Sequence, residues 1–177
     1  MKKSHLKDNH EVMIKEATKE NAQQMIEFYN IVGGETDFLS FGKNEFNRNI
    51  EEYKEFIEST RQEHNSTILL AILQEEIIGI ASINSSQKQR MKHVGTLGIV
   101  VSEEHIGQGI GRKLMEQLIH WASSNGITKK ISLVTREDNN HAIELYEKLG
   151  FEKEGMLKKD SFINGSYYNT FVMALFL

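Results

Sequence analysis

The chain has 177 residues, of which 39% are hydrophobic, and its formal net charge is −4 at pH 7. This length and apolar content predict one folded domain, and the lack of a Lys/Arg cluster argues against nucleic-acid binding through a basic patch. No apolar run is long enough to span a membrane, and the absence of cysteine excludes disulfides and a cysteine nucleophile and favours a cytoplasmic protein. We expect the polar residues 1–10 to form a flexible tail and residues 11–177 to form the domain.

The hydrophobic pattern changes between strand and helix spacing along the chain. Short apolar runs predict strands, at residues 12–17, 67–73, 77–83, 94–101 and 130–135. Apolar residues at helical spacing predict four helices, at residues 19–32, 44–63, 109–125 and 139–149. Asn164 and Gly165 predict the turn of a final hairpin, which ends in the apolar residues 171–177. This order of elements indicates an α/β domain with a mixed, mostly antiparallel sheet.

Three alternate glycines, Gly107, Gly109 and Gly111, separate the apolar run at 97–101 from the helix predicted after them. Glycine allows tight turns and a close approach of the backbone to a ligand, because it has no Cβ. A strand, a glycine loop and a helix N-terminus together present unpaired N–H groups and the positive end of a helix dipole. The run therefore predicts a binding site for a phosphate or pyrophosphate.

Two familiar phosphate-binding loops do not fit this run. A P-loop needs Gly-Lys followed by Ser or Thr, and a dinucleotide-binding turn needs G-x-G-x-x-G with an acidic residue about 20 positions later, where this chain has Ile131. A glycine-rich turn without a ligand is the remaining alternative. Arg112 and Lys113 weigh against it, because cations in the first turn of a helix are unfavourable unless an anion binds there.

Two motifs in register resemble a known family, the GNAT superfamily of N-acetyltransferases. They are Leu97-Gly98-Ile99-Val100-Val101 running into Gly107-Gln108-Gly109-Ile110-Gly111, and Asn139-x-x-Ala142-Ile143-x-Leu145-Tyr146-x-Lys148-x-Gly150-Phe151. The resemblance covers residues 12–177 and is nearest to the bacterial branch of small-amine and ribosomal-protein acetylases. It implies the GNAT fold, with six to seven strands, a splayed parallel pair of strands and about four flanking helices. It also implies acetyl-CoA as the acetyl donor.

The resemblance implies contacts with acetyl-CoA along both motifs. The backbone of residues 99–101 would pair with the pantetheine arm, and one N–H there would polarise the thioester carbonyl. The glycine-loop amides would bind the pyrophosphate, and Asn139 would reach the pantetheine or cap its own helix. The expected cofactor-binding residues are Ile99, Val100, Val101, Gly107, Gln108, Gly109, Ile110, Gly111, Arg112, Lys113, Asn139, Ala142, Tyr146 and Lys148.

Tyr146 is the expected catalytic residue, because the resemblance implies that it protonates the departing thiolate. A phenol pKa of ~10 and a thiol pKa of ~8.5 leave that proton transfer about 2 kcal/mol uphill. Tyr146 also lies on an apolar helical stripe with Ala142, Leu145 and Leu149. The alternative is therefore an aromatic side chain packed in the core.

The sequence departs from the family pattern at two positions. Ile106 stands where the family has Arg or Gln, so one contact with the phosphates is missing and the affinity for the cofactor is expected to be lower. Thr96 stands where many members have a glutamate that acts as general base through water. The base stays open between Glu35, Asp37, Glu103 and His93, or the acceptor arrives already deprotonated.

The acceptor is expected to bind at the loop after the first helix, with Glu35, Asp37 and Phe38 as its contacts. Two carboxylates favour a small cationic amine, an amino acid or an antibiotic as acceptor. The alternatives are a protein N-terminus, as in the ribosomal-protein acetylases, and a non-catalytic acyl-CoA-binding module. The seven histidines show no paired spacing, so we expect no metal. We expect no nucleic-acid or membrane partner, and a homodimer is left open.

Overall fold

The structure is a computed structural model that describes residues 2–5 and 11–177. Its strands are β1 (Lys2–His5), β2 (Glu11–Glu16), β3 (Thr67–Leu73), β4 (Glu76–Ser85), β5 (Val94–Val101), β6 (Lys130–Arg136), β7 (Glu152–Ile163) and β8 (Ser166–Phe176). Its helices are the short 3₁₀ helices η1 (Lys19–Asn21) and η2 (Glu103–His105) and the α-helices α1 (Ala22–Val32), α2 (Ile50–Gln62), α3 (Ile110–Ser124) and α4 (Asn140–Lys148).

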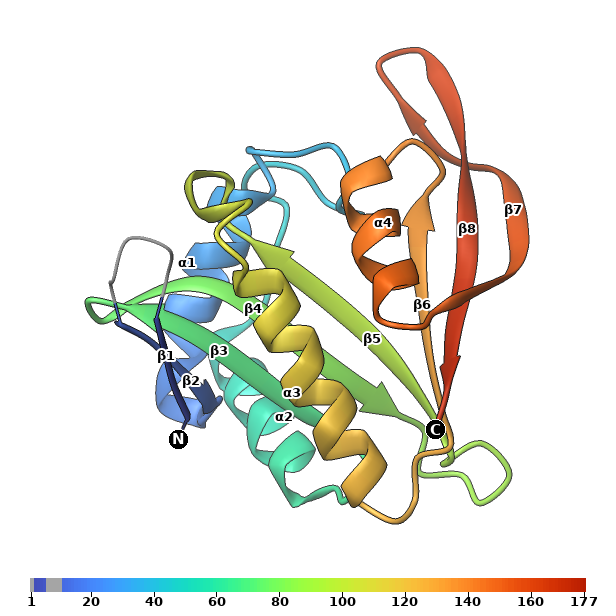
Figure 1. Cartoon of the computed structure of the whole chain (residues 1–177). Coiled ribbons are helices and arrows are strands. Elements are labelled where there is room, and N and C mark those ends of the chain that lie inside the picture. The colour runs from blue at the N-terminus through green and yellow to red at the C-terminus, as the bar shows by residue number, and fades with distance from the viewer. Residues whose placement is uncertain (1, 6–10) are drawn as a thin grey trace.

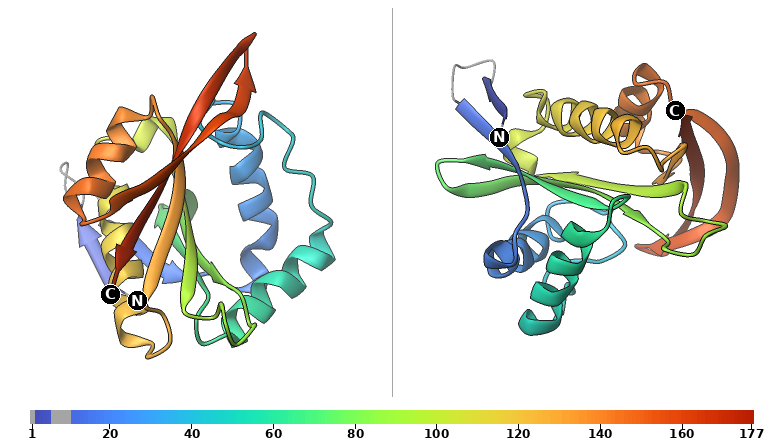
Figure 2. Two further views of the ribbon diagram at one scale, coloured as in Figure 1. Left: turned by 90° about the vertical axis from the view of Figure 1, so that its right-hand side faces the viewer. Right: turned by 90° about the horizontal axis from the view of Figure 1, so that it is seen from below.

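The described strands form one mixed sheet in the order β1-β2-β3-β4-β5-β6-β8-β7. Figure 2 shows α3 and α4 on one face of this sheet and α1 and α2 on the other. Each face has its own core: Leu114 and Leu118 of α3 pack on the first face, and Met25 and Ile57 pack on the second. Because helices cover both faces, the central strands are continuously apolar rather than alternating. The predicted fold class is thereby confirmed.

The sheet has one parallel pair among the described strands, and that pair separates. β5 and β6 pair only at Val94–Lys130, Gly95–Ile131 and Thr96–Ser132. Beyond these positions β5 continues along β4 and β6 continues along β8, while the two strands diverge from each other (Figure 1). The splayed pair expected from the family resemblance is present, and it leaves one edge of β5 without a strand partner.

The first residues and the strand count differ from expectation. Residues 2–5 were expected to belong to a flexible tail, but they form β1, which pairs antiparallel with β2. An exposed edge strand offers unpaired N–H and C=O groups, and β1 satisfies those of β2. The described sheet therefore has eight strands rather than six or seven. Residues 1 and 6–10 of the expected tail lie outside the described residues.

The second helix begins later than its hydrophobic pattern predicts. Helix was expected from residue 44, but α2 begins at Ile50, where the Asn49 side chain caps the N–H groups of Glu51 and Glu52 at 2.9 and 3.2 Å. Phe46, counted as part of the helical stripe, instead lies in the preceding loop, with its ring centroid 4.5 Å from that of Tyr29. The apolar residue serves an aromatic cluster, so the pattern is not helical there. Similarly, the first turn of the helix predicted at 19–32 is the 3₁₀ helix η1.

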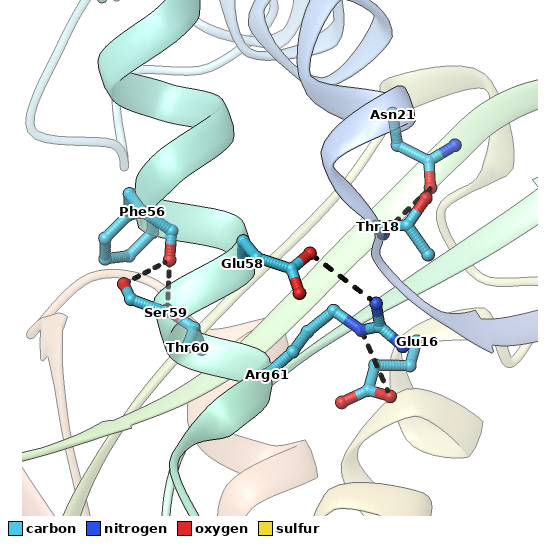
Figure 3. Close-up of polar contacts among 8 residues, drawn as sticks. All are labelled: Glu16, Thr18, Asn21, Phe56, Glu58, Ser59, Thr60 and Arg61. Atoms are coloured by element: carbon cyan, nitrogen blue, oxygen red, sulfur yellow. Dashed lines mark hydrogen bonds and ion pairs between the residues drawn. The ribbon is translucent and has the colours of Figure 1, made fainter.

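Polar contacts fix α2 against the start of the domain, away from the splayed strands. Arg61 lies 3.7 Å from carboxylate oxygens of both Glu58 and Glu16, and so joins α2 to β2 (Figure 3). Nearby, the Thr18 hydroxyl lies 3.2 Å from the Asn21 side chain at the start of η1. These contacts belong to the scaffold. In the part of the chain that the structure describes, no helix has the length and apolarity needed to cross a membrane.

Candidate active site

The divergence of β5 and β6 opens a cleft of about 540 Å³. Its walls come from residues 97–101 of β5 and 133–136 of β6. The rest of the lining comes from the loop after α1, the glycine loop, one side of α4, and the hairpin of β7 and β8. The two sequence motifs and the expected acceptor loop therefore meet at one place. This proximity depends on the topology and not on closeness along the chain.

The open edge of β5 carries backbone groups of alternate residues. The carbonyl of His93 accepts hydrogen bonds from Lys129 and Lys130 on the β6 side, whereas the N–H of Ser102 donates to Ile78 of β4. Backbone groups of successive strand residues point to opposite edges. Ile99 and Val101 therefore present their N–H and C=O groups to the cleft, as expected of residues that pair with an extended ligand.

Val100, the third residue expected to pair with the pantetheine arm, faces the other way. Its backbone points to β4, and its side chain packs against the core beneath α1 and α2. Leu97, which sequence reasoning did not select, has the same orientation as Ile99 and lines the cleft. The period of two along a strand accounts for both differences. The backbone groups of Val100 are therefore paired with β4, although the residue also lines the cleft, and backbone contacts with the cofactor stay predictions for Ile99 and Val101.

The glycine loop leaves the N-terminus of α3 without a side-chain cap. Gly107 and Gly109 have φ of +81° and +86°, which other residues rarely adopt, and Gly109 is itself the N-cap of α3. By contrast, Asn49 and Asn139 cap α2 and α4 with their side chains. The first N–H groups of α3 have no intrahelical partner, so they are available to an anion. The arrangement fits the pyrophosphate of a nucleotide cofactor.

The other expected residues of this loop are placed differently from one another. Gly107 and Gly111 line the cleft, whereas the side chain of Ile110 is buried in the core. The Arg112 Nε atom lies 2.8 Å from a carboxylate oxygen of Glu116, so the positive charge of Arg112 already has a partner on the same helix. Gln108 donates to the carbonyl of Glu104, and Lys113 is half-buried in the first turn.

On α4, the structure separates three of the expected cofactor residues. Asn139 lines the cleft and caps its own helix, because its Oδ1 atom accepts from the N–H of Ala142 at 3.4 Å. Ala142 lines the cleft beside it. Lys148 does not line the cleft: its exposed ammonium group pairs with Glu144 at 3.2 Å. The resemblance to the family motif placed Lys148 with the cofactor, but its side chain lies on the solvent side of α4.

Tyr146 lines the cleft from α4 with only 7% of its surface exposed. Among the described residues its hydroxyl has no hydrogen-bond partner, so it is available to a ligand. Burial disfavours the charged phenolate and raises the pKa of Tyr146 to about 12. Tyr146 thus packs in the core and also lines the cleft, so the structure is compatible with both alternatives, a core aromatic residue and a proton donor. The group stays protonated at neutral pH, as a proton donor must.

The higher pKa changes the energetics of proton transfer. A difference of about 3.5 pKa units from an ordinary thiol makes transfer to the thiolate about 5 kcal/mol uphill instead of about 2. Burial disfavours a thiolate as it does a phenolate, so a thiol bound in the same apolar cleft would also have a raised pKa. The uphill free energy of the transfer would then be smaller than the Tyr146 pKa alone implies.

The expected acceptor residues Glu35, Asp37 and Phe38 all line the cleft. The carboxylate of Glu35 accepts the backbone N–H of Glu103 at 2.8 Å. Among the candidate bases, Glu103 also lines the cleft. His93 directly precedes β5, at the end where β5 and β6 are still paired, and does not line the cleft. The structure brings three carboxylates to the acceptor side.

The hairpin of β7 and β8 supplies cleft residues that sequence reasoning missed. Between Leu157 and Ser161 the strand register shifts, and Lys159 takes a positive φ of 53°. Asn169 of β8 holds this bulge by accepting the N–H of Lys159 at 3.0 Å. As a result Asp160 and Ser161 line the cleft, and the Ser161 Oγ atom is buried with no hydrogen-bond partner among the described residues. A bulge leaves no local sequence signal that would have identified them.

Arg136, the last residue of β6, is a second cleft residue that the sequence did not suggest. Its guanidinium contacts Asp138 of the following loop and the carbonyl of Asp37. The partner is 99 residues away in the sequence, so no spacing pattern could indicate it. Elsewhere in residues 2–5 and 11–177, no three potential ligand side chains gather as a metal site.

Comparison with known proteins places the chain in a family. A sequence profile of the acetyltransferase (GNAT) family matches residues 35–151. The chain is 33% identical over 106 residues to the L-amino acid N-acetyltransferase AaaT of Escherichia coli, covering 60% of this chain and 65% of that protein. It is 33% identical over 78 residues to the spermidine N(1)-acetyltransferase of Escherichia coli, covering 44% of this chain and 42% of that protein. In both cases it spans less than two thirds of the relative.

A solved structure extends the likeness to nearly the whole chain. The acetyltransferase of the GNAT family from Streptococcus pneumoniae superimposes with a TM-score of 0.91 at 32% identity, covering 94% of this chain and 99% of that one. The chain therefore belongs to the GNAT family of acetyltransferases, enzymes whose acetyl donor is acetyl-CoA. The resemblance seen in the two motifs is confirmed.

Ile106 offers a test of the anion site, because it is 53% exposed and lines the cleft beside Gly107. We expect Ile106→Arg to lower the Kd for coenzyme A by about 2- to 5-fold, the gain from an exposed ion pair of about 0.5–1 kcal/mol. Calorimetric titration at two salt concentrations measures it, and the gain should shrink at high salt. Met91→Arg, at a similarly exposed residue outside the cleft lining, is the matched control. Equal gains in both variants would contradict a phosphate site at the glycine loop.

Proposed function

We propose that the protein transfers an acetyl group from acetyl-CoA to a small cationic amine, with both substrates bound together. One observation carries this proposal. The unpaired edge of β5, the uncapped N-terminus of α3 and the unpartnered hydroxyl of Tyr146 border one cleft, whose opposite wall carries carboxylates. The residues present fit the pantetheine amides, the pyrophosphate and the sulfur of the cofactor, because an open strand edge, an uncapped helix N-terminus and an unpartnered hydroxyl lie along one cleft.

Each residue has a defined task in this proposal. Acetyl-CoA supplies the thioester when it is bound. The N–H groups of Ile99 and Val101 donate to carbonyl oxygens along the open edge, and one of them stabilises the negative charge that develops on the attacked carbonyl oxygen. The first amides of α3 hold the pyrophosphate. The neutral nitrogen of the acceptor would form the new carbon–nitrogen bond as the carbon–sulfur bond breaks, and its surplus proton would pass to solvent. Tyr146 holds a proton at its Oη atom, would deliver it to the sulfur, and would be reprotonated from solvent.

The charge of the cleft wall favours a cationic acceptor. Its acidic lining residues are Glu35, Asp37, Glu103 and Asp160. The only lining residue with a permanent positive charge among those described is Arg136, and its guanidinium is bonded to the Asp138 carboxylate at 2.6 Å. An ammonium group therefore gains attraction from this wall, whereas an acceptor carboxylate finds no unengaged cation. The buried Ser161 Oγ adds one hydrogen-bonding position for the acceptor.

The names of two relatives agree with an amine acceptor, since one acetylates spermidine and the other L-amino acids. The charge of this chain's cleft favours the polyamine over the amino acid. Acetylation of a protein N-terminus and binding of acyl-CoA without turnover are the rival functions, and both are outcomes of the same test. A cytoplasmic location and a homodimer stay predictions.

An acceptor panel tests the proposed substrate class. Diamines, polyamines, aminoglycosides, amino acids and peptide N-termini are supplied with acetyl-CoA, and released thiol is measured. We expect the amines that carry a second positive charge and no carboxylate to give the highest kcat/KM. Turnover of peptides alone would support an N-terminal acetyltransferase, and coenzyme A binding without any turnover would support the binding module.

Tyr146→Phe tests the proton donor. We expect kcat to fall about 100-fold or more with the Kd for coenzyme A unchanged, since the lost hydroxyl acts as a general acid. Burial keeps the pKa of Tyr146 near 12, so this group stays protonated and causes no loss of kcat in the wild type below about pH 11. Tyr53→Phe is the matched control, because burial raises the pKa of Tyr53 to about 12 as well and Tyr53 does not line the cleft. An unchanged kcat in Tyr146→Phe would remove Tyr146 from the reaction.

A further inference from the structure

Residues 35–40, which we call the acceptor strap, join the separated ends of the two splayed strands. On the β5 side, the Glu35 carboxylate accepts the N–H of Glu103 at 2.8 Å. On the β6 side, the carbonyl of Asp37 accepts from the Arg136 Nη1 atom at 2.9 Å. Figure 1 shows this segment running from the end of α1 toward α4 and the C-terminal end of β6. The strap therefore spans the mouth of the cleft and is held once on each side.

The anchor on the β6 side is the Arg136 guanidinium, which combines three hydrogen bonds with two aromatic contacts. The Arg136 Nε and Nη2 atoms donate to the two carboxylate oxygens of Asp138 at 2.9 and 2.6 Å, while Nη1 donates to the strap. The guanidinium carbon lies 4.7 Å from the ring centroid of Phe38 and 3.9 Å from that of Tyr168. Only 10% of the side chain is exposed. The planar, five-donor guanidinium can satisfy this geometry, and a lysine ammonium cannot.

Few other contacts hold the strap in place. Within it, the N–H of Phe38 donates to the Thr36 hydroxyl at 3.2 Å, which shapes the turn but does not attach it to the sheet. The strap supplies Glu35, Asp37 and Phe38 to the cleft lining. At its far end Leu39 packs against the core beneath α1 and α2. The polar attachment of the strap to the two splayed strands therefore depends on the Glu35 and Arg136 anchors.

We propose that Arg136 is a positioning residue that holds the acceptor strap over the cleft and thereby sets the affinity for the acceptor. The proposal rests on the proposed function, because it requires that the acceptor bind beneath the strap. It does not make Arg136 a ligand of the acceptor, since three of its N–H groups already bond to Asp138 and Asp37 and its guanidinium plane lies against Phe38 and Tyr168. The consequence is a separation of effects: losing Arg136 weakens acceptor binding and leaves the cofactor wall intact.

The kinetic test uses Arg136→Lys, which keeps the positive charge but loses the bidentate hydrogen bonds to Asp138 and the planar group that packs against Phe38 and Tyr168. We expect KM for the acceptor to rise about 10-fold, while kcat and the Kd for coenzyme A change less than about 3-fold. Arg61→Lys is the matched control, since Arg61 also holds two carboxylates but lies away from the cleft lining (Figure 3). An acceptor KM equal to that of the wild type would overturn the proposal. A rise confined to acceptors that carry a carboxylate would also overturn it, because it would show direct binding by Arg136.

A structural test does not depend on activity. We expect chymotrypsin to cleave after Phe38 at least about 5-fold faster in Arg136→Lys than in the wild type or in Arg61→Lys, because the ring loses its cationic partner and the strap its anchor. Mass analysis of the fragments identifies the cut. Asp37→Asn should change this rate by less than about 2-fold, since Arg136 hydrogen-bonds the carbonyl of Asp37 and the carboxylate adds only a longer-range attraction.

The two tests separate failure of this inference from failure of the proposed function. Unchanged cleavage in Arg136→Lys would overturn the anchor. Faster cleavage, with no amine of the panel acetylated by the wild type, would support the anchor and overturn the proposed function. If Arg136→Lys lowers the melting temperature severely, Asp138→Asn takes its place, because it keeps the arginine and removes its charged partner. We expect Asp138→Asn to change both measurements in the same direction by a smaller factor.

Discussion

The short pairing between β5 and β6 is the constraint on which the rest of the structure depends. Three residue pairs hold the parallel strands together, after which each strand follows its antiparallel neighbour and the two separate. Unpaired backbone groups at the middle of a sheet are costly unless something else satisfies them. A cofactor with amide groups can satisfy them, and we therefore propose that the break in the ladder is also the binding site.

The two sides of the opening have different chemistry because they come from different segments. On the α3 and α4 side, backbone amides at the uncapped end of α3 and the protonated Tyr146 border the cleft. On the opposite side, the strap and the β7 bulge contribute carboxylates, and Arg136 forms an ion pair with Asp138. Under the proposed function, the cofactor site is therefore built mainly from backbone groups, and the acceptor site from side chains.

Local patterns predicted the parts of the fold and site that depend on local physics. The strand at Thr67–Leu73, the glycine loop before α3 and the Asn139 cap of α4 all follow from residues close together in the sequence. Features that depend on distant partners were not predictable. Phe46 precedes α2 and packs against the distant Tyr29. Asp160 reaches the cleft because β8 lies between β6 and β7 in the sheet. The orientation of Val100 needed the register with β4.

The central claim is that the open edge of β5 binds the acetyl donor through alternate backbone groups. Residue-resolved amide hydrogen exchange, measured by NMR with and without coenzyme A, tests it most directly. We expect the N–H groups of Ile99 and Val101 to exchange more slowly when coenzyme A is added. The exchange of the Val100 N–H, which is already paired with β4, should change little. Protection of all three amides alike, or binding without protection of Ile99 and Val101, would contradict it.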